Sequence, residues 1–251
     1  MSQDAALDQA EAALQRGDAA GAEQAIAKQW RDLSKAPGDA LHIMAMVRMA
    51  QNNVVEGEQY MRSALRAEPN SLRHHIALGH ILSAAGKHGE AVDSYTAATR
   101  IDPTWPNLYV ALAFANYHAG RPLEAERAAM EALKRPSADG WDVLSCALRE
   151  QGKGREALQA ADEALRLDWR HLNAQNSRGA ALLMVNRPKE ALDMFDAIAA
   201  QGVDMPVLAI NRGQALEMLG RQSEARALYE DAARRWPNLP NLQERLKAKL
   251  Q

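Results

Sequence analysis

The chain has 251 residues, of which 47% are hydrophobic and 25% are charged, and its formal net charge is -2. This composition is that of a folded globular protein, and it excludes both an intrinsically disordered chain and a membrane-embedded one. The near-neutral charge gives no electrostatic reason to expect nucleic acid or an anionic membrane as a partner.

The cysteine content and the N-terminal segment bear on the cellular compartment. Cys146 is the single cysteine, which excludes an intrachain disulfide and fits a reducing compartment, so we expect a cytoplasmic protein. Residues 1–14 are acidic and polar and lack the basic start and continuous apolar core of a secretory signal. No stretch of the sequence approaches the roughly 18 apolar residues that a membrane span requires.

The segment 72–105 shows the unit from which the chain is built. Its first half is apolar at helical spacing from Ile76 to Leu82, Gly86 interrupts the pattern, and a second helical pattern ends before Pro103. Two short helices joined by a glycine turn cannot bury their shared apolar face alone, whereas stacked copies of the pair can. The sequence therefore predicts a repeat protein.

A frame that sets Leu72 as position 1 and spans 72–105 recurs along the whole chain. Small residues recur at positions 8, 20 and 27, where we expect helices to approach closely. Position 15, between the two helices, holds residues that adopt a positive φ at little cost. They are Gly17, Asn52, Gly86, Gly120, Gly152, Asn186 and Gly220. The predicted units are 3–37, 38–71, 72–105, 106–137, 138–171, 172–205 and 206–239.

The last segment, 240–251, carries Leu242, Leu246 and Leu250 on one helical face and charged or polar residues on the other. We expect a capping helix that covers the open end of the stack. The sequence stops there without a linker or tail, and this end could be natural or the edge of a fragment of a longer protein.

The repeats resemble the tetratricopeptide repeat family. The resemblance rests on LGHILSAAGKHGEAVDSYTAATRIDP at 78–103 and on echoes such as NRGQALEMLGRQSEARALYEDAARRWP at 211–237, and it covers almost the whole chain. It implies an all-α fold, a right-handed superhelical solenoid of stacked antiparallel helix hairpins. It also implies a single domain over 1–251, with the first helix of each hairpin lining the concave face.

Motifs of catalysis are absent from the sequence. There is no HExxH, no GxSxG and no CxxC pair, and Gly86-Lys87 and Gly152-Lys153 lack the rest of a phosphate-binding loop. We therefore expect no catalytic residues, no cofactor site and no metal site, and a protein that is not an enzyme.

The histidines allow more than one interpretation. His42, His80 and His118 fall at positions 5, 9 and 13 of successive first helices. They are either three unrelated surface residues or a hydrogen-bonding or pH-sensitive stripe in the groove. A metal site is the least favoured reading, because no carboxylate or cysteine sits at matching positions. His75 is expected at a packing position, with His74 beside it facing outward.

A partner-binding groove is predicted from the positions that line the concave face in this family. Its residues are His42, Met46, Met49, Ile76, His80, Val110, Phe114, Tyr117, His118, Asp142, Arg149, Asn173 and Asn176. The part of the groove from residue 42 to residue 118 is apolar and aromatic and contains methionines, which adapt to partners of different shape. The part from residue 142 to residue 176 is polar. We expect the apolar residues to anchor a partner and Arg149, Asn173 and Asn176 to orient its backbone.

Two classes of function remain open at this stage, with a third as a weaker option. The first is a non-catalytic scaffold that binds a protein or peptide segment in its groove. The second is the N-terminal, partner- or substrate-recruiting arm of a larger bacterial multidomain enzyme, an oxygenase or transferase. The third is self-association, in which the concave face of one copy accepts the irregular first unit of another.

Overall fold

The computed structural model describes residues 2–105 and 107–237, and all regular structure in this part of the chain is helical. The first seven α-helices are α1 (Gln3–Gln15), α2 (Ala19–Gln29), α3 (Gly38–Ala50), α4 (Val54–Ala67), α5 (Leu72–Ala84), α6 (His88–Ile101) and α7 (Leu108–His118). The others are α8 (Pro122–Ala132), α9 (Ala138–Glu150), α10 (Gly154–Leu167), α11 (Leu172–Met184), α12 (Pro188–Ala200), α13 (Pro206–Met218) and α14 (Gln222–Arg235). A short 3-10 helix, η1 (Leu33–Lys35), follows α2. The predicted all-α fold is confirmed.

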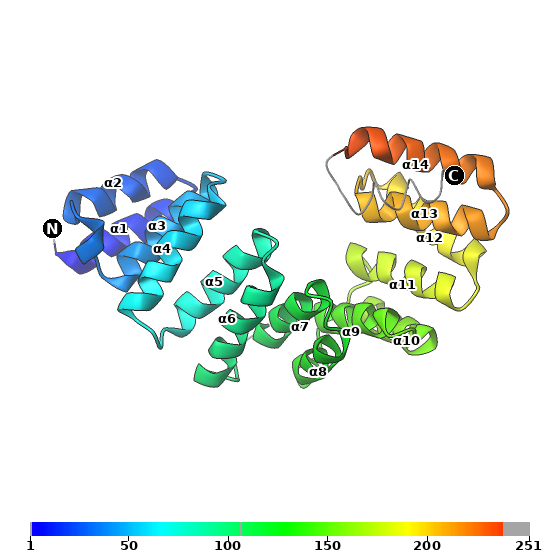
Figure 1. Cartoon of the computed structure of the whole chain (residues 1–251), viewed down its shortest axis with the longest axis horizontal. Coiled ribbons are helices and arrows are strands. Elements are labelled where there is room, and N and C mark those ends of the chain that lie inside the picture. Colours follow the sequence, from blue (N-terminus) through cyan, green and yellow to red (C-terminus); the bar gives the residue numbers. More distant parts are fainter. Residues whose placement is uncertain (1, 106, 238–251) are drawn as a thin grey trace. The chain divides into compact units, whose positions relative to one another are not determined.

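The helices belong to two compact units, Met1–Gly120 with α1 to α7 and Arg121–Gln251 with α8 to α14. Within each unit, helices adjacent in sequence lie side by side as hairpins, for example α3 with α4 and α13 with α14 (Figure 1). The boundary between the units falls inside the fourth predicted repeat, after α7. A single solenoid over 1–251 stays a prediction, and the predicted capping helix at 240–251 lies outside the described residues.

The turns inside the hairpins depend on the glycines and asparagines that recur in the sequence. All seven adopt a left-handed conformation, with φ between +58° and +76°. At Gly86 the N–H groups of Gly86 and Lys87 donate to the carbonyls of Ser83 and Leu82, at 3.0 and 2.8 Å. These bonds satisfy carbonyls at the end of α5 and reverse the chain into α6. The predicted turn positions are confirmed.

Small residues let the two helices of a hairpin approach, and three of these contacts are made by a glycine against an aromatic ring. A Cβ atom on Gly79 would lie 2.5 Å from the ring of Tyr95. The equivalent pairs are Gly179 with Phe195 and Gly213 with Tyr229, at 2.4 and 2.3 Å. In the second hairpin, Ala45 holds the position of this glycine and Met61 holds the position of the aromatic residue. The two positions therefore complement each other in volume.

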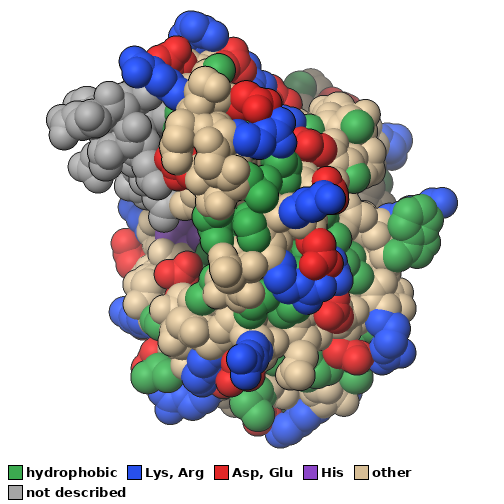
Figure 2. All heavy atoms as spheres, turned by 90° about the vertical axis from the view of Figure 1, so that its right-hand side faces the viewer, with side chains coloured by type: hydrophobic (Ala, Val, Ile, Leu, Met, Phe, Trp, Pro, Cys, Tyr) green, Lys and Arg blue, Asp and Glu red, His purple; other side chains and the backbone are tan. Residues whose placement is uncertain are grey.

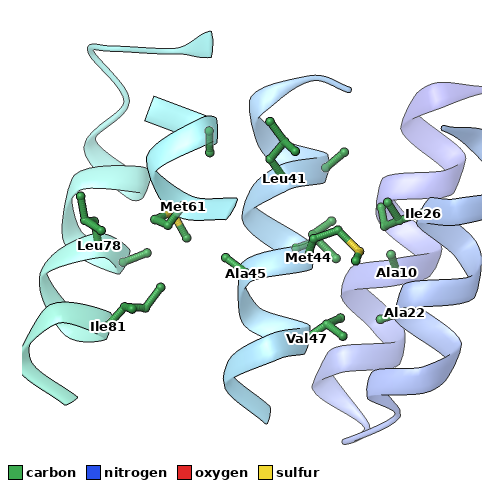
Figure 3. Close-up of a cluster of buried hydrophobic side chains, with 14 of the residues drawn as sticks. Ala10, Ala22, Ile26, Leu41, Met44, Ala45, Val47, Met61, Leu78 and Ile81 are labelled. Carbon is green, nitrogen blue, oxygen red and sulfur yellow. The ribbon is translucent and has the colours of Figure 1, made fainter. Parts of the chain in front are cut away.

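The core of the first unit is a layer of aliphatic side chains between α1, α2, α3, α4 and α5 (Figure 3). Ile26, Met44, Met61, Leu78 and Ile81 are all buried. The alanines between them bring the helix backbones together, so a continuous core forms with few large residues.

Polar contacts between successive hairpins also recur at fixed repeat positions, which the sequence reading did not identify. Glu58 in α4 accepts hydrogen bonds from Lys87, at 2.9 Å, and from Arg62. Glu126 in α8 accepts from Lys153, at 3.0 Å, and from Gln151. The amide of Gln151 and the ammonium of Lys153 hold the pKa of Glu126 below its usual value. These half-buried pairs join neighbouring hairpins within each unit.

We expect Gly79→Ala to lower the free energy of unfolding by about 1 kcal/mol, the middle of the range that two opposing effects give. The clash with Tyr95 costs about 1–3 kcal/mol, whereas removing a helical glycine returns roughly 0.5–1 kcal/mol. Urea denaturation followed by far-ultraviolet circular dichroism measures the change. The double variant Gly79→Ala with Tyr95→Met copies the Ala45 and Met61 pair. It should be less destabilised than the sum of the losses measured for the two single variants. A stability unchanged by Gly79→Ala alone would contradict the close approach.

No helix in the described part of the chain is long and apolar enough to cross a membrane.

Candidate functional site

A hollow of about 340 Å³ lies between α3 and α5 in the first unit. Its walls are formed by His42, Met46, Met49, Arg73, Ile76, Ala77, His80, Ile81 and Trp105. Five of these residues belong to the predicted groove, which shows that successive first helices do bring them together. Trp105, which is half-exposed and follows α6, also lines the α3–α5 hollow and was missed. The hollow can take an apolar group, because methionine, isoleucine, alanine and tryptophan side chains are among those that line it.

The two histidines that line the hollow differ in exposure, so they are not a uniform row of surface residues. His42 is only 5% exposed, so its reading as a surface residue is wrong: its ring packs against His74, with ring centroids 5.2 Å apart. Burial, helped by Arg73 and His74, lowers the pKa of His42 to about 3. His80 is exposed, and its Nδ1 atom is hydrogen-bonded to the Tyr95 hydroxyl at 3.0 Å. The pKa of His80 is lowered, because the protein around the exposed ring still removes part of its hydration.

A second group of predicted residues forms an aromatic cluster on α7, which consists of Phe114, Tyr117 and His118 together with His88 of α6. The ring of His118 stacks on that of His88 at 5.0 Å and meets Tyr117 edge-on at 5.0 Å. Phe114 and Tyr117 are half-buried, and His118 is exposed. Partial loss of hydration around the ring and the neighbouring His88 lower the pKa of His118. The three predicted groove histidines therefore favour their neutral forms, which does not favour the pH-sensitive stripe.

Two predicted groove residues are buried under the surface. Val110 is 9% exposed and Asp142 is 1% exposed. Burial raises the pKa of Asp142, and the Ser177 hydroxyl opposes that rise. Both side chains are therefore covered by the surrounding protein and are not accessible to a partner.

The polar residues predicted in the second unit are more accessible. Asn173 is exposed, whereas Arg149 and Asn176 are half-buried. The Nδ2 group of Asn211 on α13 donates to Oδ1 of Asn176 on α11 at 3.0 Å. This bond ties two successive first helices together. Asn176 is thus already part of the hairpin packing, and Asn173 has the more open side chain.

His74 lies in the interior, not on the surface as the sequence reading expected. Its side chain is 0% exposed, and each ring nitrogen faces a carboxylate without forming a well-aligned hydrogen bond in the described part of the chain. Nε2 lies 3.5 Å from Oδ1 of Asp39, and Nδ1 lies 3.8 Å from Oε2 of Glu68. Burial lowers the pKa of His74, while these carboxylates oppose that effect. His75 is half-buried, and its Nε2 atom lies 3.0 Å from the Pro69 carbonyl oxygen.

The burial of His74 follows from its repeat position, which is the third in the frame. That position is buried in each hairpin from the second to the seventh. Its residues are Ala40, His74, Leu108, Gly140, Ala174 and Leu208. The sequence carried this signal, because five of the six residues are small or apolar. His74 is the polar exception.

The surface carries charges of both signs close together. On the face shown in Figure 2, Lys and Arg side chains alternate with Asp and Glu side chains. Arg178 pairs with Asp162 and Arg212 pairs with Asp196, each an arginine of one hairpin with an aspartate of the preceding one. Neither this face nor the net charge of -2 favours a nucleic-acid partner.

Comparisons with known proteins agree on one family. The model described as tetratricopeptide repeat matches residues 44–106, 143–206 and 185–240. A tetratricopeptide repeat protein from Parabacteroides merdae has a similar structure, with a TM-score of 0.81, 14% identity, and coverage of 99% of this chain and 98% of that one. TTC0263, a thermophilic repeat protein of Thermus thermophilus, gives a TM-score of 0.63 and 22% identity over 72% of this chain and 99% of that one.

A further structural match is found in a complex. The crystal structure of the APC/C hetero-tetramer Cut9–Hcn1 gives a TM-score of 0.73 and 14% identity, covering all of this chain and 49% of that one. At these identities the likeness shows the fold alone. A comparison with curated protein sequences finds no significant match.

Proposed function

Because this chain belongs to the tetratricopeptide repeat family, we propose that it is a non-catalytic scaffold that binds a protein or peptide segment along its first helices. The fold is one that generally mediates protein–protein interactions. The finer part of the proposal is the place of binding, which is the α3–α5 hollow with the aromatic cluster on α7.

The α3–α5 hollow is the observation that carries this proposal. Met46, Met49 and Ile76 are half-buried within it, so each keeps apolar surface that a partner side chain can cover. Methionine adapts to side chains of different shape, which suits a site that receives an extended or helical segment. Arg149 and Asn173 are a separate candidate set of polar contacts on the second unit alone.

The other functions considered from the sequence lack a favouring observation. Nothing in the described residues or in the comparisons supports a recruiting arm of a larger enzyme, and self-association stays a prediction. The reducing compartment, expected from the single cysteine, and a bacterial source also stay predictions.

Peptide display tests the proposal directly. The immobilised full chain is used to select from a library of random peptides, and we expect enrichment of sequences with large apolar side chains. Binding of the selected peptides should fall about tenfold or more in Ile76→Glu, because a carboxylate then occupies the apolar wall. Fluorescence anisotropy with labelled peptides measures the affinities.

The matched control is Val55→Glu, on α4. Val55 is 68% exposed and does not line the hollow, so this variant adds the same charge elsewhere. We expect it to bind the selected peptides as the wild-type chain does. Equal loss in both variants, or equal binding by Ile76→Glu and the wild type, would count against the α3–α5 hollow as the binding place.

A further inference from the structure

The cluster around His74 brings together three groups that commonly bind metal ions. Asp39 comes from the first turn of α3, Glu68 from the residue after α4, and His74 from the first turn of α5. One ligand atom from each of the three lies within 4.8 Å of the others. The sequence does not show a carboxylate near a histidine here, because these residues come from three separate segments of the chain.

His74 is the part of this cluster that packing leaves unexplained. Its repeat position otherwise holds small or apolar residues, yet here it holds a buried imidazole whose two ring nitrogens face carboxylates, at 3.5 and 3.8 Å, without a well-aligned hydrogen bond. An unsatisfied buried polar group costs about 1–3 kcal/mol. His171 provides a contrast within the same chain. Its Nε2 atom is hydrogen-bonded to Asp139 at 2.8 Å, and its Nδ1 atom accepts from the N–H of Ala174.

The spacing of the cluster suits a metal ion. In tetrahedral coordination, nitrogen and oxygen ligands about 2.1 Å from zinc lie roughly 3.4 Å from one another. Nε2 of His74 is 3.5 Å from Oδ1 of Asp39, close to that separation. Oε2 of Glu68 lies 3.8 Å from the other ring nitrogen, Nδ1, so the partly exposed Glu68 side chain would have to turn toward Nε2 to bind the same ion. Gly38 keeps this space open, since a Cβ atom there would lie 2.5 Å from Oε1 of Glu68 and 3.0 Å from Cε1 of His74.

Access and charge are also consistent with a cation. The side chains of Asp39 and Glu68 are 48% and 43% exposed, so an ion can enter from solvent and keep water among its ligands. Arg73 is the nearest opposing charge, with Nη1 3.7 Å from Oδ1 of Asp39. Its other terminal nitrogen donates to Glu11 at 2.6 Å, which gives the arginine an anionic partner of its own.

We propose that Asp39, Glu68 and His74 form a binding site for a divalent transition-metal ion such as Zn²⁺, with water completing the coordination. One imidazole with two carboxylates is a ligand set that zinc accepts. The ion would link α3, the end of α4 and α5, and so would fix the second hairpin to the third beside the α3–α5 hollow.

Zinc titration of the metal-free full chain tests this site. Isothermal titration calorimetry with zinc chloride at pH 7.5 should show one equivalent bound, and the midpoint of thermal unfolding should rise with zinc. Asp39→Asn and Glu68→Gln should each weaken this binding at least tenfold. His74→Leu should abolish it, and this variant is expected to fold, because Leu108 and Leu208 occupy the same repeat position.

The matched control is Asp168→Asn. Asp168 holds the repeat position of Glu68, but the residue that corresponds to His74 is Ala174 there. We expect zinc binding and the zinc-dependent rise in thermal stability to be unchanged in this variant. Absence of saturable zinc binding by the wild-type chain would overturn the proposal. Binding that persists unchanged in all three cluster variants would also overturn it, and would place the zinc at other residues.

Discussion

Replacing Phe195 with alanine should lower the free energy of unfolding by about 3–5 kcal/mol, the usual cost of removing a buried phenylalanine ring. Phe195 is 0% exposed and lies in the core of the second unit, against Gly179 of α11. The loss includes the transfer of the ring from the core and the cavity that remains in its place. Urea denaturation followed by circular dichroism at 222 nm measures the effect.

The variant Gly179→Ala tests the close contact between Gly179 and the Phe195 ring separately from the cost of removing that ring. In the wild-type chain the added Cβ atom would lie 2.4 Å from the ring of Phe195, so the substitution should destabilise. In the Phe195→Ala background the same methyl group enters the cavity and should stabilise. The sign of the effect is expected to reverse. An effect of equal sign and size in both backgrounds would contradict the packing of Gly179 against Phe195. The control is Leu123→Ala, at a side chain that is 60% exposed, and its free energy of unfolding should stay within about 0.5 kcal/mol of the wild-type value.

The fold could be predicted from the sequence because its determinants are local. A glycine or asparagine between two helical patterns indicates a left-handed turn by itself, and all seven predicted turns have that conformation. Asn107 and Gly202 also have positive φ, at 60° and 77°, but they lie between hairpins. There the spacing varies from one repeat to the next, so the frame contained no position that would single them out.

The candidate site was predicted less well, because exposure depends on how neighbouring hairpins pack. The frame indicates which residues share the face of the first helices, and three of them, Met46, Met49 and Ile76, line one hollow. It could not show that His42 is covered by His74. It also could not place Trp105, which reaches the hollow from the segment after α6.

The error at His74 has a different origin. The residue was treated as outward-facing from its neighbour His75, whereas comparison of the third position across six hairpins would have placed it inside. An imidazole at a position that otherwise selects alanine, glycine or leucine was a usable signal. The two carboxylates beside it were not predictable in the same way, since they come from two other helices.

The double variant Phe114→Ala with Tyr117→Ala should lose affinity for the peptides selected by the wild-type chain by about 30-fold or more. Each aromatic anchor in an interface contributes about 1–4 kcal/mol on truncation, and 2 kcal/mol corresponds to roughly 30-fold in the dissociation constant. Both side chains are half-buried on α7, so each rests on the hairpin while keeping surface for a partner. Fluorescence anisotropy measures the dissociation constants.

The control for this loss is Leu123→Ala with Met130→Ala. These two residues lie on α8, are each 60% exposed, and remove a comparable apolar surface from another helix. We expect the control to bind as the wild-type chain does, and both double variants to keep the far-ultraviolet helical signal. If removal of Phe114 and Tyr117 leaves binding intact while Ile76→Glu removes it, the partner contacts only the α3–α5 hollow. Because His118 stacks on both His88 and Phe114, the cluster would then serve to hold α7 against α6.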